Sequence, residues 1–424
     1  MSIPEPQNGQ KRIVILGAGF AGLKLARRLA ENKKFQLLII DRNNYHQFQP
    51  LLYQVATAGL EPSSISFPIR KVFQDKKNVF IRIAGVTEIK ADEQTVCTEA
   101  GNFHYDKLVI ALGTNTNYYG NQQLETNSIG LKSIPEALYI RNKILKNYEK
   151  ALVTEDEQER EAALNLVIVG GGPTGVELAG AFAELKNNIL PKEYPELNFS
   201  KMNIYLIEAS DRLLSSMTRF SSRKTREYLE KLGVKISLNT QVKTYDGSLI
   251  LTNDGAIRSL CVVWAAGVKA QPVAGVPADS IGKNGRIIVN EFNEVTTLKN
   301  VYAIGDIALV KTGETPNGHP QLAPVAIQQA RNLAKNIVRS FENRPLLPFK
   351  YIDKGSMATV GRNLAVVELP FIRFGGFTAW LTWMFIHLMS ILGIKNRFFI
   401  FINWVSNYFT YNLSLRLIIK PFRD

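Results

Sequence analysis

The residues best suited to chemistry form two glycine-rich turns, each with the pattern G-x-G-x-x-G. The glycines are Gly17, Gly19 and Gly22 within VILGAGFAGLKLAR (14–27), and Gly170, Gly172 and Gly175 within VIVGGGPTGVELAG (167–180). Glycine at these places permits a tight turn, close approach of backbone N–H groups to a pyrophosphate, and close packing of a helix on a strand. The N-terminus of the helix that follows then faces the anion. Two such turns predict two bound dinucleotides, usually a flavin and a nicotinamide cofactor with hydride passing between them.

Each turn is flanked by elements that would position it. KRIVILG (11–17) and LNLVIVG (164–170) are apolar runs ending in glycine, which is typical of buried parallel strands, and a helical pattern follows each turn. The next predicted strands, 35–41 and 202–208, end in Asp41 and Glu208. An acid at this position accepts a hydrogen bond from a ribose 2′-hydroxyl. Because it also repels a 2′-phosphate, Glu208 predicts a preference for NADH over NADPH.

Other segments complete this pattern. The stretch 187–200, which contains two prolines, is expected to be a loop that accounts for the longer spacing to Glu208. The charged stretch 154–164 is expected to be a solvated connection. VVWAAGV (262–268), which contains Gly267, and ALGT (111–114), which ends in Thr114, are interpreted as strands closing over the nicotinamide cofactor and the flavin.

Length and composition fit such a protein. At 424 residues the chain exceeds the size of a single core, so two or three domains are expected. Lys and Arg outnumber Asp and Glu by 51 to 37, which favours anionic partners such as nucleotides, nucleic acid or an anionic membrane. Cys97 and Cys261 form no CxxC, and the four histidines have no metal-ligand spacing, so neither a disulfide framework nor a metal site is expected. The first ten residues lack the pattern of a signal or transit peptide and are expected to be a frayed tail.

Five stretches together resemble the type II NADH dehydrogenases, single-subunit NADH:quinone oxidoreductases that do not pump protons. They are NYHQFQPLLYQVATAG (44–59), GGGPTGVELAG (170–180), VYAIGD (301–306), LAPVAIQQ (322–329) and GSMATVGRNLAVVE (355–368). The resemblance spans almost the whole chain and is more specific than either turn. It implies an α/β fold with two Rossmann-like dinucleotide-binding domains of the glutathione-reductase-like kind. The expected parts are an FAD-binding domain (11–122 and 287–350), an NADH-binding domain (160–286) and a C-terminal amphipathic membrane-docking module (351–424).

The resemblance also implies which residues hold the cofactors. Those expected to contact FAD are Gly17, Ala18, Gly19, Phe20, Ala21, Gly22, Asp41, Arg42, Val86, Thr114, Asp306, Ala326 and Ile327. Those expected to contact NADH are Gly170, Gly172, Gly175, Glu208 and Gly267. VYAIGD also resembles the motif of the glutathione-reductase-like flavoproteins whose aspartate holds the ribityl chain of FAD, so Asp306 is expected to do so here.

Glu177 stands two residues after the last glycine of the second turn, where the first turn has Lys24. The resemblance implies that this acid lies near the flavin and the quinone pocket, where it supports quinone reduction and proton delivery. The alternative is a purely stabilising role, because a carboxylate on the first turn of a helix benefits from the macrodipole.

The quinone contacts depart from the family pattern. Many relatives have Ala-Gln-x-Ala where this chain has Ala323-Pro324-Val325-Ala326. Proline has no side-chain donor to offer a quinone carbonyl. Gln328 or Gln329 is therefore expected to serve instead, or else backbone and water, with Gln321 as a third candidate.

The C-terminal part contains two uncharged runs, 374–394 and 398–415. Their length would allow a transmembrane hairpin. In the second run, however, polar residues recur at helical spacing on one side of the helix and apolar residues on another, which favours a helix lying in a membrane interface. The polar stripe is Asn403, Ser406, Asn407, Thr410 and Ser414. A buried core helix is the alternative for the first run, where His387 is expected to be a packed residue satisfied by a backbone carbonyl.

The sequence therefore predicts an FAD-dependent NADH:quinone oxidoreductase. Expected partners are NADH, a membrane quinone and the lipid surface, with a possible homodimer, no nucleic acid and a location on the cytoplasmic face of the inner membrane. A sulfide:quinone reductase is one alternative, although it would need a reactive cysteine pair near the flavin. The others are a reductase of a soluble acceptor and a nucleotide-sensing interaction flavoprotein.

Overall fold

The computed structural model describes residues 3–7, 9–271, 273–311, 315–410 and 416–418. The chain packs into two compact units. The first unit is made of residues 1–46, 67–115 and 268–353, and the second of residues 47–66, 116–267 and 354–424. The C-terminal segment thus packs in the same unit as the second glycine-rich turn. The predicted division into three functional parts stays a prediction.

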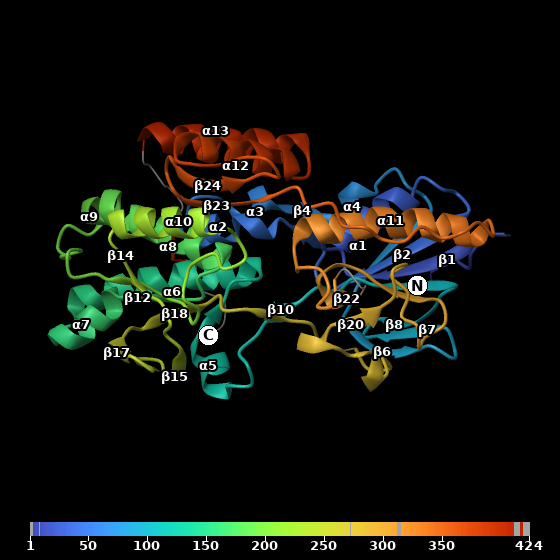
Figure 1. The fold of residues 1–424 in the computed structure, drawn as a ribbon, viewed down its shortest axis with the longest axis horizontal. Helices are drawn as coiled ribbons and strands as arrows, with labels where there is room; N and C mark the ends of the chain where they lie inside the picture. Colours follow the sequence, from blue (N-terminus) through green and yellow to red (C-terminus); the bar gives the residue numbers. More distant parts are fainter. Residues whose placement is uncertain (1–2, 8, 272, 312–314, 411–415, 419–424) are drawn as a thin grey trace. The chain divides into compact units, whose positions relative to one another are not determined.

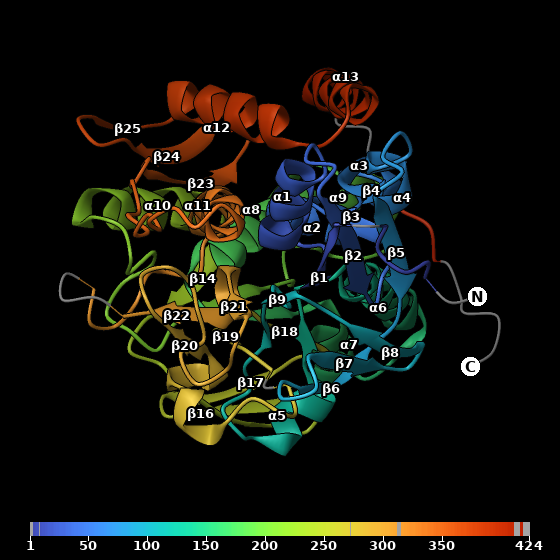
Figure 2. The ribbon, with the colours of Figure 1, turned by 90° about the vertical axis from the view of Figure 1, so that its right-hand side faces the viewer.

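The first unit, whose strands β1 and β2 are labelled in Figure 1, is built on a parallel sheet with the order β21-β9-β1-β2-β5, which can be followed in Figure 2. Its strands are β1 (Lys11–Leu16), β2 (Phe35–Asp41), β5 (Val79–Ile83), β9 (Lys107–Ile110) and β21 (Val301–Ala303). The central strand β1 is buried from its second residue onward, as expected for a strand with both faces covered. α1 (Phe20–Leu29) follows the first turn and packs against α11 (Ala323–Phe341). The predicted order of strand, turn, helix and strand is confirmed.

Smaller elements complete the first unit. They are α4 (Ile69–Val72), the antiparallel strands β6 (Val86–Lys90), β7 (Thr95–Thr98) and β8 (Gly101–His104), the paired strands β20 (Ile287–Val289) and β22 (Ala308–Val310), and the short helices η2 (Ala278–Ser280), η3 (Lys283–Gly285) and η4 (Gly305–Ile307). Four short strands lie where the chain passes from one unit to the other: β3 (Tyr45–Gln47), β4 (Ser66–Pro68), β10 (Asn115–Thr116) and β19 (Val268–Lys269).

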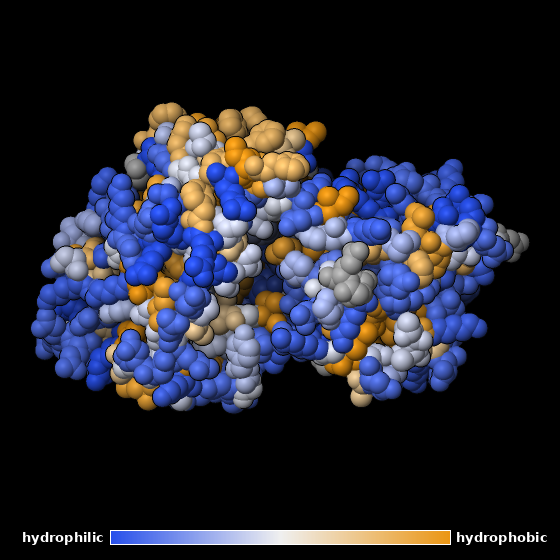
Figure 3. Space-filling model, viewed as in Figure 1, coloured by the Kyte–Doolittle hydropathy of each residue, from blue (hydrophilic) through white to orange (hydrophobic). Residues whose placement is uncertain are grey.

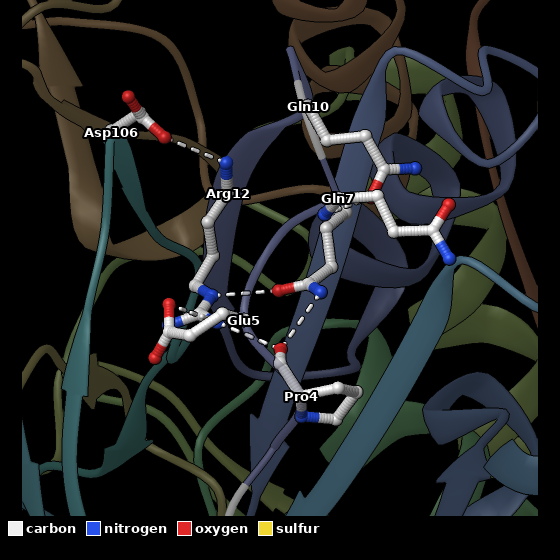
Figure 4. A network of polar contacts seen from close by, with 7 residues as sticks. Pro4, Glu5, Gln7, Gln10, Arg12 and Asp106 are labelled. Atoms are coloured by element: carbon white, nitrogen blue, oxygen red, sulfur yellow. Dashed lines mark hydrogen bonds and ion pairs between the residues drawn. The ribbon is translucent and has the colours of Figure 1, made fainter.

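The N-terminal segment is anchored to the first unit, so the expectation of a frayed tail is wrong for residues 3–7. Ile3 is buried in the core beneath the sheet. The Pro4 carbonyl accepts hydrogen bonds from Arg12 Nη2 at 3.0 Å and from Gln36 Nε2 at 3.1 Å (Figure 4). Arg12 is buried on β1, and a buried guanidinium must find acceptors. The N-terminal segment supplies one of them.

The second unit repeats this architecture with the sheet order β11-β18-β12-β13-β14. Its strands are β11 (Ile129–Gly130), β12 (Leu166–Val169), β13 (Ile204–Ile207), β14 (Val234–Ser237) and β18 (Cys261–Trp264), all parallel. Three of its helices are α6 (Ile134–Val153), α8 (Pro173–Asn188) and α10 (Arg219–Lys231). The shorter elements are η1 (Gln49–Leu51), α2 (Leu52–Ala56), α3 (Pro62–Ile65), α5 (Gln122–Asn127) and the antiparallel strands β15 (Val242–Tyr245), β16 (Leu249–Thr252) and β17 (Gly255–Arg258).

One expectation about connections in this unit is wrong, and a second is incomplete. The segment 187–200 is not simply a loop, because α8 extends to Asn188 and α9 (Leu190–Glu193) follows. The charged segment 154–164 contains α7 (Glu157–Leu164), which buries Ala162, Ala163 and Leu164 while its acidic residues stay at the surface. Three small or apolar residues at one end of an otherwise charged helix are enough to dock it.

A C-terminal antiparallel sheet packs on α8. It consists of β23 (Ser356–Gly361), β24 (Leu364–Glu368) and β25 (Arg373–Gly375). α8 and β23 approach so closely that a Cβ atom at Gly180 would lie 1.6 Å from the Val360 carbonyl oxygen. Figure 2 shows α8 and α10 on one side of this sheet and α12 (Phe377–Ser390) on the other. The helix that carries Glu177 is therefore held between the parallel sheet and the C-terminal sheet.

α12 and α13 (Ile394–Thr410) expose apolar side chains, while two asparagines of α13 face the protein. Asn396 Nδ2 donates to the Ser66 carbonyl at 3.2 Å, and Asn407 Nδ2 donates to the Gly59 carbonyl at 3.3 Å. Among the described residues, no helix is both long enough and apolar enough to cross a membrane. We call the exposed side chains the apolar surface (Figure 3); they are Phe377, Leu381, Phe385, Ile386, Met389, Ile394, Phe398, Phe399, Phe401, Ile402, Val405 and Phe409.

The predicted polar stripe of α13 is divided between two environments. Asn403 and Asn407 are half-buried, whereas Ser406 and Thr410 are exposed. Ser414 lies outside the described residues. The helix of a water-soluble protein normally buries its apolar side. α13 instead docks partly through hydrogen bonds and leaves its apolar side outward.

Candidate functional site

The first glycine-rich turn is shaped so that only glycine fits at two of its positions. Gly17 has a φ of +97°, and a Cβ atom there would lie 2.5 Å from the Ala111 carbonyl oxygen. A Cβ atom at Gly22 would lie 1.9 Å from the Gly17 carbonyl oxygen, whereas the space beside Gly19 is open. α1 begins after Gly19 with no side-chain cap and no acid in its first turn. Its first N–H groups are therefore left for an anion.

Asp41 lies beside this turn. Its Oδ2 atom accepts the Ala18 N–H at 2.6 Å, and its Oδ1 atom accepts the Asn43 N–H at 2.8 Å. Burial raises the pKa of Asp41, and these two N–H groups lower it in part. The Ala84 N–H donates to the Asp41 carbonyl and so brings the segment before Val86 to the same strand end. Arg42 is exposed.

The remaining residues predicted to contact FAD meet around η4. Thr114 Oγ1 donates to Asp306 Oδ2 at 3.4 Å. Gly305 has a φ of +78°, and a Cβ atom there would lie 3.0 Å from Ala21 and 3.6 Å from Ala326. The first unit therefore brings α1, η4 and the start of α11, which also carries Ile327, to one place. An uncapped helix start beside two carboxylates fits a dinucleotide with a pyrophosphate and ribose or ribityl hydroxyls.

The second turn repeats the construction of the first. Gly170 has a φ of +115°, and its Cβ atom would lie 2.5 Å from the Ala265 carbonyl group. A Cβ atom at Gly175 would lie 1.9 Å from the Gly170 carbonyl oxygen, and the space beside Gly172 is open. Gly267 follows β18 with a φ of +147°. The second unit therefore brings the predicted NADH-contacting glycines together.

Glu208 is held at this turn by hydrogen bonds to both of its oxygens. Oε2 accepts the Gly171 N–H at 2.5 Å, and Oε1 accepts the N–H and the hydroxyl of Ser210 at 2.8 and 2.7 Å. Its carboxylate thus lies beside the second turn, where the ribose of a dinucleotide would lie.

Replacement of Glu208 by glutamine should relax discrimination against NADPH. The variant keeps the shape of the side chain but loses the negative charge that repels a 2′-phosphate. We expect the NADH/NADPH ratio of kcat/KM to fall about tenfold or more, the value of one charge contact in a partly buried site. Asp211→Asn, three residues further along and exposed, is the matched control. An unchanged ratio in the Glu208 variant would mean that this carboxylate does not face the ribose.

Glu177 is buried on α8, with 8% of its surface exposed. Its Oε1 atom accepts the Thr359 N–H from β23 at 3.4 Å. Burial raises the pKa of Glu177 to about 8, although the Thr359 N–H and then the Trp383 indole N–H favour the charged form. The first turn of α8 contains no acidic residue. The stabilising role expected for a first-turn carboxylate therefore does not apply. Burial is the main influence on the pKa of Glu177.

A cavity of about 170 Å³ adjoins Glu177, and all of its lining residues belong to the second unit. A dry cavity of about 150 Å³ is large enough to bind benzene, so this one can take a single six-membered ring. α2, α8, β23, α12 and α13 all contribute to its wall. Lining residues with polar groups include Tyr53, Gln54, Glu177, Glu184, Trp383 and Trp404.

Two aromatic groups bring hydrogen-bond donors to this cavity. Trp383 has 1% of its surface exposed, and its indole N–H makes no hydrogen bond of ordinary geometry within the described part of the chain. It is nevertheless close enough to lower the pKa of Glu177. Tyr53 is buried, and its hydroxyl oxygen accepts a hydrogen bond from Gln54. The cavity thus combines apolar walls with an acid and donors.

A second carboxyl lies on the same helix. Glu184 is two turns beyond Glu177 on α8 and accepts a hydrogen bond from the Arg362 N–H. Burial raises the pKa of Glu184 as well. Two carboxyls with raised pKa values, one buried and one half-buried, on one wall of one cavity mark it as a candidate site of proton chemistry.

The predicted quinone-contacting glutamines are engaged elsewhere in the first unit. Gln328 Oε1 accepts the Ile352 N–H at 3.0 Å, and its Nε2 atom donates to the Ile352 carbonyl at 2.9 Å. Gln329 Oε1 accepts the Gly305 N–H at 2.7 Å. Pro324 lies in the first turn of α11. Their role stays a prediction, and a quinone would have to replace these hydrogen bonds.

Other titratable residues are accounted for by packing. His387 Nδ1 donates to the Trp383 carbonyl at 2.8 Å, as expected, and burial lowers the pKa of this histidine to about 4. Cys97 and Cys261 are free thiols, and burial raises the pKa of Cys261 to about 12. In the described ranges no group of His, Cys, Asp and Glu could hold a metal ion.

Sequence reasoning missed Tyr53, Gln54, Glu184 and the two tryptophans as partners of Glu177. One signal was available for Glu184, because GVELAGAFAEL places two acids seven residues apart on an otherwise apolar helical face. Tyr53 and Gln54 lie within one of the stretches that carry the family resemblance. Nothing in their local sequence indicates which residues of the C-terminal helices meet them.

Family models match both the part of the chain with the two glycine-rich turns and the C-terminal part. The model of the pyridine nucleotide-disulphide oxidoreductases matches residues 11–330, and that of the NDH2 C-terminal domain matches residues 354–411. A type II NADH:quinone oxidoreductase of Mycobacterium tuberculosis, NdhA, is 36% identical over 421 residues, which cover 95% of this chain and 88% of that protein. A type II NADH:quinone oxidoreductase of Haemophilus influenzae is 30% identical over 389 residues, covering 85% and 87%.

Solved structures agree on the fold. NDH2 from Plasmodium falciparum in complex with NADH superposes with a TM-score of 0.88 over 97% of this chain and 100% of that one, at 22% identity. The sulfide:quinone oxidoreductase of Aquifex aeolicus superposes with a TM-score of 0.70 over 97% of this chain and 96% of that one, at 19% identity. At these identities the comparison concerns the fold alone.

Proposed function

We propose that this chain, which belongs to the type II NADH:quinone oxidoreductases, oxidises NADH with FAD as its cofactor and delivers the two electrons to a quinone. The observation that carries the proposal is the presence of two glycine-rich turns of the same construction in one chain, each with an uncapped helix start and an acid that accepts a backbone N–H of the turn. The first unit would hold FAD, and the second would hold NADH.

When bound, the flavin would supply the redox chemistry that links a hydride donor to a quinone acceptor. The chain's own residues position the partners and manage protons. The overall reaction, NADH + H⁺ + quinone → NAD⁺ + quinol, consumes one proton beyond the hydride. Glu177 keeps its carboxyl proton at neutral pH because burial raises its pKa to about 8. We therefore assign the cavity beside Glu177 to the quinone ring and Glu177 to proton supply.

A sulfide:quinone reductase of the same fold is less well supported. That chemistry needs a pair of reactive cysteines, whereas Cys261 is fully buried with a pKa raised to about 12. Thiolate is the reactive form of cysteine, so a thiol with such a pKa is inert at neutral pH.

We further propose that the apolar surface of α12 and α13 docks the enzyme on a lipid bilayer. A surface with this many exposed aromatic and aliphatic side chains marks an interaction site. Lys395 lies among these residues and is exposed, which suits anionic lipid headgroups. The cytoplasmic face of the membrane and a homodimeric state remain predictions.

Purified protein should contain FAD, and its absorbance should bleach anaerobically on addition of NADH and recover on addition of a quinone analogue. Steady-state NADH oxidation should increase strongly when the quinone is present. A flavin that bleaches but recovers only with a soluble acceptor such as ferricyanide would contradict the quinone assignment. Slow turnover with every acceptor would favour a nucleotide-sensing role.

A further inference from the structure

We propose that Tyr53 donates its hydroxyl hydrogen to a carbonyl oxygen of the quinone ring, and that Gln54 and Trp404 position it as a donor. The inference rests on the proposed function, because it takes the cavity beside Glu177 as the quinone site. It names the hydrogen-bonding group that Pro324 cannot provide.

The three side chains form a hydrogen-bonded chain with only one possible direction. Trp404 Nε1 donates to Gln54 Oε1 at 2.8 Å, and Gln54 Nε2 donates to the Tyr53 hydroxyl oxygen at 2.8 Å. An indole nitrogen can only donate, so the amide atom that faces Trp404 must be the oxygen. The amide nitrogen then faces Tyr53, and the phenol oxygen is the acceptor. The orientation of Gln54 is therefore fixed by Trp404.

The Tyr53 hydroxyl hydrogen must consequently point away from Gln54. Within the described part of the chain no group accepts it, although Tyr53 has only 6% of its surface exposed. A buried hydroxyl hydrogen without an acceptor is costly, so its presence in a native protein calls for an explanation such as a functional role. Because Tyr53 lines the cavity, a carbonyl-bearing ring in that cavity can accept the hydrogen.

Tyr53 is suited to donating a hydrogen bond rather than a proton. Burial and the nearby Glu177 raise the pKa of Tyr53 well above its ordinary value, so the phenol keeps its proton throughout the physiological range. Consecutive hydrogen bonds that run in one direction polarise each other and strengthen the terminal donor. The division of roles is then that Tyr53 orients the ring and Glu177 supplies a proton.

The positioning residue Trp404 lies on α13, the helix whose outward side belongs to the apolar surface. Trp404 itself is buried and faces α2 through its bond to Gln54. The helix that we propose to touch the bilayer therefore also sets the direction of the donor in the cavity. Loss of that helix would remove the quinone contact as well as the apolar surface.

Two single variants test the donor role of Tyr53, one by removing its hydroxyl and one by redirecting the hydroxyl hydrogen. Tyr53→Phe removes the hydroxyl, and Gln54→Glu keeps an acceptor for Trp404 but captures the Tyr53 hydrogen for its own carboxylate. With a short-chain, water-soluble quinone we expect each variant to raise the quinone KM about tenfold, the value of one hydrogen bond, with a smaller change in kcat. Tyr139→Phe, an exposed tyrosine of α6, is the matched control.

A double-mutant cycle separates positioning from a merely structural role. If Gln54 acts through Tyr53, then Gln54→Glu should have little further effect on the quinone KM in a Tyr53→Phe background. Additive effects of the two changes would overturn the proposed chain. An unchanged quinone KM in Tyr53→Phe, with Tm and bound FAD also unchanged, would overturn the donor role of Tyr53.

The failure of this inference can be told apart from failure of the proposed function. If the wild-type protein oxidises NADH with ferricyanide but reduces no quinone, then the proposed function fails. If the wild type reduces quinone and Tyr53→Phe behaves like Tyr139→Phe, then only the inference fails. A Tyr53→Phe protein that loses FAD would show that the hydroxyl supports folding, and this outcome would also contradict a contact specific to quinone.

Discussion

Replacement of Phe398, Phe401 and Phe409 by serine should release the protein from lipid vesicles and leave NADH oxidation by ferricyanide intact. These side chains are 60%, 46% and 77% exposed, so their loss opens no cavity in the fold. Insertion of a Phe side chain into an apolar phase is worth about 1.5–3 kcal/mol. Three such losses should weaken vesicle binding by at least a hundredfold, measured by co-sedimentation with vesicles that contain anionic lipid.

The control for this variant replaces three other exposed residues of the second unit by serine. Tyr139, Val153 and Leu251 are 58%, 81% and 43% exposed and lie away from α12 and α13. This control should bind vesicles like the wild type. Lys395→Gln should weaken binding by about 1 kcal/mol, and salt should weaken the wild type in the same direction. Vesicle binding that survives the triple phenylalanine change would exclude the apolar surface as the docking site.

The dinucleotide turns could be predicted because all of their determinants are local. The glycines, the flanking strands and the terminal acids lie within one segment of chain each, and the conflicts that would follow from a side chain at Gly22 or Gly175 involve atoms five residues away. Asp306 is the exception, since it is distant in sequence and was found only through the family resemblance.

The cavity could not be predicted in the same way. Its wall combines α2, α8, β23, α12 and α13, so residues up to 350 positions apart, such as Gln54 and Trp404, become hydrogen-bonded. The hydrophobic periodicity of a sequence does not predict which residues of two amphipathic helices will contact a given strand. Which side of α13 packs on the protein could not be predicted either. It depends on the backbone carbonyls of Gly59 and Ser66, which accept hydrogen bonds from Asn407 and Asn396.

Burial also explains why the surroundings of two polar residues could not be predicted from their local sequence. Arg12 lies in an apolar strand and its sequence neighbours offer it no partner, yet the N-terminal segment folds back to supply the Pro4 carbonyl. From the sequence alone Glu177 could be a helix-stabilising acid, but it lies beyond the first turn of α8 and is buried beneath β23 and α12, and this burial raises its pKa. In both cases the decisive contact comes from a distant part of the chain.

Glu177→Gln should slow the reaction with quinone far more than the reaction with NADH. The variant keeps the shape of the side chain and its contact with the Thr359 N–H but has no proton to supply. General acid catalysis typically contributes about 10²–10⁴-fold. We expect reoxidation of the bound flavin by quinone to slow by about a hundredfold or more, and its reduction by NADH to change little, when stopped-flow absorbance times the two half-reactions. Equal slowing of both half-reactions would contradict the assignment.

The same variant should also change how stability depends on pH, and this gives a test that is independent of turnover. The pKa of Glu177 is raised to about 8, so between the ordinary carboxyl pKa and pH 8 the native state holds a proton that the unfolded state has released. Wild-type stability should therefore fall as pH rises through this window, by an amount on the order of a few kcal/mol. Glu177→Gln lacks this loss, so its Tm relative to the wild type should increase from pH 5 to pH 8. Glu161→Gln, at an exposed position on α7, should follow the wild type at every pH. A constant difference in Tm would mean that Glu177 is ionised in the folded protein at neutral pH, and the carboxyl could then not be the proton source for the quinol.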